Sequence, residues 1–338
     1  METAQTAKAL FGNKLYQQRA REALPILVRQ ATANQIISYS DLATELRMPN
    51  ARNLNFVLGS IGQTMQQLSE EWNEEIPPIN CLVCNKTTGL PGEGVGMFVS
   101  NKDFSKLPRK QQQAIVNAQL HKVFAYPYWN KVLAHLNLTP QSVPDYSSLF
   151  EAIHNKRGVD GESQFHLNLK NYIRSNPDAV GLPKNTTGET EYPLPSGDRV
   201  DVLFKLEKEC VAVEVKSRIS DTSDIFRGLF QCVKYRAVIE AFQVVRGDQS
   251  SCRVLLALES KLPAELLQMK NTLGIEVIEQ ITPKKSSVSE YLYFTPLPPG
   301  SFFLFLVFSF PGSTWERSFG GSTSIAARSE SAFSAPLR

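Results

Sequence analysis

The sequence contains few cysteines, few histidines and no long apolar run. Its five cysteines are odd in number and scattered along the chain, which excludes the disulfide framework of a small secreted domain. The apolar run Phe302–Phe308 is far shorter than the roughly 20 residues that span a bilayer. The first 25 residues lack the apolar core of a secretory signal. We therefore expect a cytoplasmic protein with no membrane partner.

An excess of one charge is also missing. The chain carries 36 Lys and Arg against 33 Asp and Glu, a net charge of +3, so whole-chain charge does not point to a nucleic-acid partner. Residues 1–150 carry 14 basic and 11 acidic residues, a net charge of +3. Residues 151–338 carry 22 of each and are neutral. The mild basic bias therefore belongs to the first half.

Cys81 and Cys84 form a C-x-x-C pair, but no second pair of ligands follows at similar spacing. A structural zinc site needs four such ligands. The pair is therefore better explained as buried strand cysteines than as half of a zinc site.

The length of 338 residues predicts about two domains. In residues 1–150, helical periodicity covers about 12–30, 40–70 and 104–138, and Ser40 is the expected N-cap of one helix. A short extended segment, 77–84, leads into a glycine-rich turn or wing at 88–94. Residues 139–161 have the composition of a linker, and 297–338 form a low-complexity tail that we expect to be flexible.

Residues 151–296 show a different pattern, in which short β-branched runs alternate with helical segments. This order predicts an α/β domain whose mixed sheet is flanked by helices. The expected helices are 165–173, 225–245 and 263–271, and the expected strands are 190–194, 200–206, 211–215, 253–258 and 275–278.

Two apolar strand segments in this domain contain charged residues. Glu214 and Lys216 alternate with valines, and Asp201 interrupts the neighbouring apolar run. Burying such charges costs several kcal/mol unless they are paired or bind a metal. A hairpin would bring Asp201 beside Glu214, where the two carboxylates need a cation. Because the ligands are oxygens, that cation would be Mg²⁺, with Mn²⁺ as a substitute.

The Asp201 and Glu214-Val215-Lys216 pattern resembles the PD-(D/E)XK nuclease superfamily, to which many restriction enzymes and RecB-type exonucleases belong. Gln231 and Tyr235 match the Gln-x-x-x-Tyr signature of the RecB-type members. The resemblance covers about residues 160–280 and implies a restriction-endonuclease-like fold. It departs from the family pattern at Val200, which stands where the family usually has proline. The catalytic set that it implies is Glu162, Asp201, Glu214, Lys216, Gln231 and Tyr235.

This resemblance implies metal-assisted hydrolysis of a phosphodiester bond. Asp201 and Glu214 would hold the metal with the Val215 carbonyl, and Glu162 would hold a second metal or its water. Lys216 would orient the attacking water and offset charge in the transition state. Asp198 is the rival of Asp201 as first ligand, and His166, one helical turn from Glu162, could also reach the site.

A local excess of positive charge follows Lys216. Between Lys216 and Arg236 there are five basic and two acidic residues, a net charge of +3, as phosphate contacts require. From this segment we expect DNA contacts by Arg218, Arg227 and Lys234.

The first half is similar to the winged-helix DNA-binding domain of alkylguanine DNA alkyltransferases over roughly residues 20–96. The segments that carry the similarity are 37–43, 49–52, 75–80 and 89–94. The resemblance implies DNA contacts by Tyr39 and Arg52. It does not imply alkyl transfer, because Ile79 and Asn80 stand where the family has its reactive Cys and the following His. The other interpretation of this half is a generic helical bundle.

The leading hypothesis is a Mg²⁺-dependent DNA endonuclease with an N-terminal DNA-binding domain, and a homodimer would allow both strands to be cut. Two alternatives remain open: a non-catalytic DNA-binding or regulatory protein that retains the nuclease fold, and an RNA-directed nuclease. For Glu214 and Lys216, the interpretation as an ordinary ion pair on a solvated edge strand also remains open.

Overall fold

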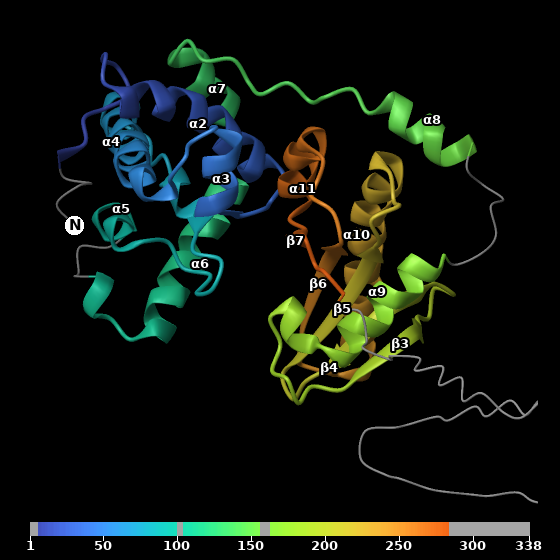
Figure 1. Cartoon of the computed structure of the whole chain (residues 1–338). Coiled ribbons are helices and arrows are strands. Elements are labelled where there is room, and N and C mark those ends of the chain that lie inside the picture. The colour runs from blue at the N-terminus through green and yellow to red at the C-terminus, as the bar shows by residue number, and fades with distance from the viewer. Residues whose placement is uncertain (1–5, 100–103, 156–162, 284–338) are drawn as a thin grey trace, which may run out of the picture. The chain divides into compact units, whose positions relative to one another are not determined.

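The computed structural model describes residues 6–99, 104–155 and 163–283 (Figure 1). Two of the sequence predictions, the site residue Glu162 and the tail 297–338, lie outside these residues.

Up to residue 136 the described chain is mainly helical. Apolar side chains from its helices form one core, to which Leu24, Leu42, Ile61 and Val132 contribute. The α-helices are α2 (Leu15–Thr32), α3 (Tyr39–Glu45), α4 (Leu54–Trp72), α5 (Gly96–Val99), α6 (Arg109–Ala125) and α7 (Trp129–His135), with short 3₁₀ turns η1 (Ala51–Asn53), η2 (Ile79–Leu82), η3 (Glu93–Val95) and η4 (Phe104–Lys106).

Two details in this region correct the sequence analysis. The N-cap of α3 is Ser38 and not Ser40, because the Ser38 hydroxyl accepts the backbone N–H of Asp41 at 3.0 Å. The segment 77–84 is extended only at β2 (Val83–Cys84), which pairs in parallel with β1 (Ile37–Ser38). Its earlier residues form the 3₁₀ turn η2, so Cys81 is buried but does not lie in a strand.

The second region contains a five-stranded mixed sheet in the order β3-β4-β5-β6-β7 (Figure 1). The first three strands are antiparallel and the last three are parallel. The predicted α/β character with a mixed sheet is therefore confirmed. The strands are β3 (Gly188–Pro193), β4 (Arg199–Lys205), β5 (Glu209–Lys216), β6 (Ser251–Leu258) and β7 (Glu276–Ile278). The helices are α8 (Ser147–Asn155), α9 (Gln164–Ser175), α10 (Thr222–Arg246) and α11 (Leu267–Leu273), with 3₁₀ turns η5 (Pro177–Val180) and η6 (Ala264–Leu266).

The two faces of the sheet are covered by different helices. On one face α9 packs against β3, β4 and β5, and its Leu169 shares a core with Val202 and Val213. On the other face α10 packs against β5 and β6, and its Leu229 shares a core with Leu203. Because side chains on a strand alternate between faces, these two cores account for the apolar runs of β4 and β5.

The predicted linker 139–161 contains a helix, which is a further correction. α8 has an amphipathic sequence, and its Phe150 packs edge-on against Phe226 of α10 with ring centroids 5.0 Å apart. Packing against another helix stabilises a segment whose composition alone suggests a loop. Among the described residues, none of the helices is both long enough and apolar enough to cross a membrane.

Helix α10 begins three residues earlier than the apolar periodicity predicts. Asp221 is its N-cap, and a reciprocal capping box links Asp221 to Asp224. The helix ends at Gly247, which has a φ of +67° that glycine adopts without steric cost. These caps set the length of the helix that carries Gln231 and Tyr235.

Candidate functional site

The alternation of side chains in β4 is broken next to Asp201. Val200 and Val202 would share a face in a regular strand, but Val200 packs in the core on the α10 side and Val202 in the core on the α9 side. The residue opposite Asp201 on β3 is Glu191, which has a φ of +53°. This irregularity lets the Asp201 side chain reach His166 of α9.

The contacts of Asp201 come from two elements. Its Oδ2 accepts the backbone N–H of Val215 at 2.7 Å, and its Oδ1 lies 3.3 Å from His166 Nε2. Burial would raise the pKa of Asp201, but His166, the Val215 N–H and the Lys216 charge together outweigh it and hold the pKa below its ordinary value. Asp201 is therefore held as a carboxylate.

Glu214 and Lys216 project from the same side of β5, as the sequence predicts. Lys216 Nζ donates to Glu214 Oε1 at 2.6 Å, and the Glu214 side chain is 3% exposed. The pairing of β4 with β5 ends at Val202 and Val213, so one residue further along each strand Asp201 and Glu214 occupy opposite positions. The hairpin thus brings the three charged residues to one end of the paired strands.

The charges of these residues act on one another. Burial raises the pKa of Glu214 above its ordinary value, Asp201 adds to the rise, and the Lys216 ammonium opposes it. Burial would lower the pKa of Lys216, but Glu214 and Asp201 outweigh that effect and raise it. The site therefore contains two acidic groups whose charges interact and the Lys216 ammonium, which they hold in its charged form. The Glu214–Lys216 ion pair is largely buried, and β5 lies between β4 and β6. It is therefore not the solvated edge-strand pair of the alternative interpretation.

Helix α10 positions Lys216. Gln231 Oε1 accepts from Lys216 Nζ at 3.0 Å, and Gln231 Nε2 donates to the Tyr235 hydroxyl at 3.4 Å. Tyr235 in turn donates to the Arg199 carbonyl at 2.9 Å. This chain of hydrogen bonds connects the two residues of the Gln-x-x-x-Tyr signature with the lysine and with the start of β4.

Gly228 is a site feature that the sequence analysis missed. A Cβ atom at this position would lie 2.9 Å from Lys216 Cε and 3.0 Å from Leu256 Cδ1. A glycine inside a helix costs about 1 kcal/mol relative to alanine, so its presence in the second turn of the long helix α10 is a detectable signal. Here the missing side chain leaves room for the stem of Lys216.

A second missed feature is the ion pair between Lys170 and Glu191. Lys170 is almost completely buried on α9, one turn after His166, and its ammonium binds the Glu191 carboxylate. Glu191 lies on β3 next to the part of β4 where the alternation of side chains is broken. The ion pair therefore lies beside that irregularity. A Lys in a helix and a Glu in a strand gave no sequence signal that they would pair.

The donor atoms fit a hard cation in their chemistry. Asp201 and Glu214 offer carboxylate oxygens, and neither Cys nor His is needed to complete an oxygen-rich set. In the part of the chain that is described, no cluster of three or more Asp, Glu, His and Cys has the arrangement of a metal site. Glu162, the third expected ligand, lies outside the described residues.

The remaining predicted residues of this region lie around the site. Asp198, the rival ligand, is bound by Lys234 at 2.8 Å and by the Ser196 hydroxyl at 2.6 Å. These hydrogen bonds lower the pKa of Asp198. Arg218 follows β5 and Arg227 lies on α10, and both are exposed. The positive charge of Arg227 acts on Lys216, which places it near the site.

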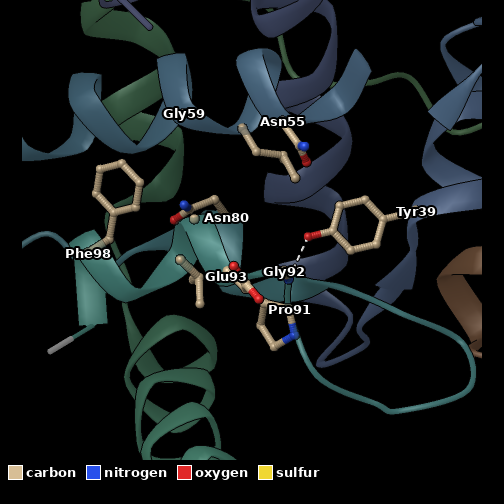
Figure 2. Close-up of a pocket in the computed structure, with 11 residues that line it drawn as sticks. Tyr39, Asn55, Gly59, Asn80, Pro91, Gly92, Glu93 and Phe98 are labelled. Atoms are coloured by element: carbon tan, nitrogen blue, oxygen red, sulfur yellow. Dashed lines mark hydrogen bonds between the residues drawn. The ribbon is translucent and has the colours of Figure 1, made fainter. Parts of the chain in front are cut away.

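The predicted DNA contacts of the first half lie on two separate elements. Arg52 is exposed in η1. Tyr39 lines a cavity of about 270 Å³ at the start of α3, and its hydroxyl accepts the backbone N–H of Gly92 at 2.8 Å (Figure 2). Asn80 lines the same cavity, and its buried Oδ1 has no hydrogen-bond partner among the described residues. The glycine-rich segment thus forms one wall of a small polar cavity.

The C-x-x-C pair is buried, as expected. Burial raises the pKa of Cys84 to about 12 and raises the pKa of Cys81 still further. The Cys84 Sγ lies 3.5 Å from the Cys81 carbonyl oxygen. Both residues are therefore buried thiols, and Cys84 lies in β2 as the sequence predicts.

Comparison of the chain with protein-family models, with curated proteins and with solved structures found no match.

Proposed function

We propose that this protein is a metal-dependent DNA endonuclease that hydrolyses phosphodiester bonds. The observation that supports it best is the meeting of Asp201, Glu214 and Lys216 at one end of the β4–β5 hairpin. Acidic and basic groups with shifted pKa values cluster at functional sites. Here Asp201, Glu214 and Lys216 all have shifted pKa values, and a chain of hydrogen bonds holds the lysine. A restriction-endonuclease-like fold for residues 151–296 belongs to the same proposal.

Each residue has a role that its contacts permit. Asp201 and Glu214 would hold Mg²⁺, with Glu162 as a further ligand, and the bound ion would polarise the scissile phosphate and acidify a water molecule. Lys216 places a positive charge where the negative charge of the transition state develops. Gln231 keeps that ammonium in position, and Tyr235 fixes Gln231.

The DNA-binding part of the proposal assigns phosphate contacts to exposed basic residues. Arg218, Arg227 and Lys234 lie around the site, and Arg52 would contact DNA from the first half, together with Tyr39. A winged-helix domain in residues 1–150 and a homodimer remain parts of this proposal.

Removal of the metal tests the proposed reaction. Purified full-length protein incubated with plasmid, linear, branched and single-stranded DNA is expected to cut at least one form in the presence of Mg²⁺ or Mn²⁺. Excess EDTA is expected to stop cleavage, and added Mg²⁺ to restore it. Gel electrophoresis of the products checks this. Metal-independent DNA binding with no cleavage of any form would instead favour the non-catalytic alternative. Preferential cleavage of RNA over DNA of the same sequence would favour the RNA-directed one.

A further inference from the structure

Three exposed aromatic and aliphatic side chains are close in sequence to residues of the proposed site. Phe165 precedes His166 and is 39% exposed, Ile219 follows Lys216 by three residues and is 56% exposed, and Phe230 precedes Gln231 and is 37% exposed. Exposed apolar side chains are informative where they gather around a site, so their neighbours matter here.

Each phenylalanine at this site has an arginine beside it. The Arg218 guanidinium lies 4.2 Å from the centre of the Phe165 ring, so the loop after β5 meets the start of α9. Arg227 precedes Phe230 by three residues on α10, so the two share one side of the helix. We name Phe165, Arg218, Ile219, Arg227 and Phe230 the aromatic rim.

The rim is held by its surroundings. The Arg218 backbone N–H donates to Glu259 Oε2 at 2.9 Å, and its guanidinium lies 4.0 Å from Glu259 Oε1. The Phe230 ring packs against the buried Phe226, with ring centroids 5.1 Å apart. The exposed rings are therefore fixed platforms, and ordering them costs little when a ligand binds.

Resting on the proposed nuclease function, we propose that the aromatic rim binds unpaired bases and that the substrate is single-stranded DNA. In a duplex the bases are already stacked on one another, so they offer no free face on which an exposed aromatic ring could stack. In a single strand, each base presents a face on which an aromatic ring stacks, and neighbouring arginines contact the phosphates. The rim offers both groups, because each of its phenylalanines has an arginine nearby.

Binding measured without cleavage tests this inference. Full-length protein in EDTA is titrated into a fluorescent 20-nucleotide single strand and into the duplex of the same sequence, and anisotropy gives each Kd. We expect the single strand to bind about tenfold more tightly. Phe165→Ala and Phe230→Ala are each expected to weaken single-strand binding about tenfold, and Phe230→Tyr to restore it.

A matched control is available at the other end of α10. Phe242 has the Arg246 guanidinium 4.1 Å from its ring centre but lies outside the rim, so Phe242→Ala is expected to leave the single-strand Kd unchanged. Duplex binding as tight as single-strand binding, or equal effects of Phe230→Ala and Phe242→Ala, would overturn the inference. If the rim variants behave as expected but no metal supports cleavage, the nuclease proposal fails and the rim assignment stands.

Discussion

Replacing Lys216 with alanine is expected to slow DNA cleavage about a thousandfold while Mg²⁺ binding persists. The ammonium is held by Glu214 and Gln231 and carries the positive charge assigned to the transition state. Loss of one such preorganised group typically costs about 10²- to 10³-fold in rate. Single-turnover cleavage with excess enzyme measures the chemical step.

The control for this variant is Lys205→Ala. Lys205 ends β4, is half exposed and pairs with Glu189 away from the site, so its loss is expected to leave the rate unchanged. Because Lys216→Ala also removes the ion pair of a buried carboxylate, circular dichroism must show that the variant is folded. Equal cleavage rates of folded Lys216→Ala and wild type would remove Lys216 from the mechanism.

Replacing Phe226 with alanine is expected to lower the free energy of unfolding by about 3–5 kcal/mol. Phe226 is completely buried on α10, and its ring packs against those of Tyr146, Phe150 and Phe230. The substitution leaves a cavity between α8 and α10. Equilibrium urea unfolding, followed by circular dichroism, gives the difference.

Val244→Ala provides the comparison on the same helix. Val244 is 80% exposed, so truncating it is expected to change the free energy of unfolding by less than about 0.5 kcal/mol. A similarly small effect of Phe226→Ala would show that α8 and the aromatic cluster do not contribute to the folded state as the structure indicates.

The sheet and its long helix could be predicted because their signals are local. Alternating and β-branched residues define β4 and β5, and the spacing of apolar residues defines α10. Side-chain alternation also predicts correctly that Glu214 and Lys216 share a side of β5. The position of Asp201 opposite Glu214 needs only a short hairpin, which the charged turn between the strands suggests.

Other features depend on contacts between distant residues. The break in alternation at Asp201 accompanies the positive φ of Glu191 and its ion pair with Lys170 of α9, none of which is visible in any one segment. Helix α8 is stabilised by packing on Phe226. Its own composition gives no sign of that contact and therefore suggests a linker. Gly228 could have been noticed as a glycine inside a helix, but its purpose depends on the path of the Lys216 side chain.

The most direct test of the central claim is whether Asp201 binds the metal. Isothermal titration calorimetry of Mg²⁺ into the full-length protein is expected to show binding that Asp201→Asn weakens at least about tenfold. Asp248→Asn is the matched control, because Asp248 lies in an exposed loop where it accepts the backbone N–H of Ser250, and we expect it to bind Mg²⁺ like the wild type. Identical Mg²⁺ titrations for wild type, Asp201→Asn and Asp248→Asn would contradict a metal site at the β4–β5 hairpin.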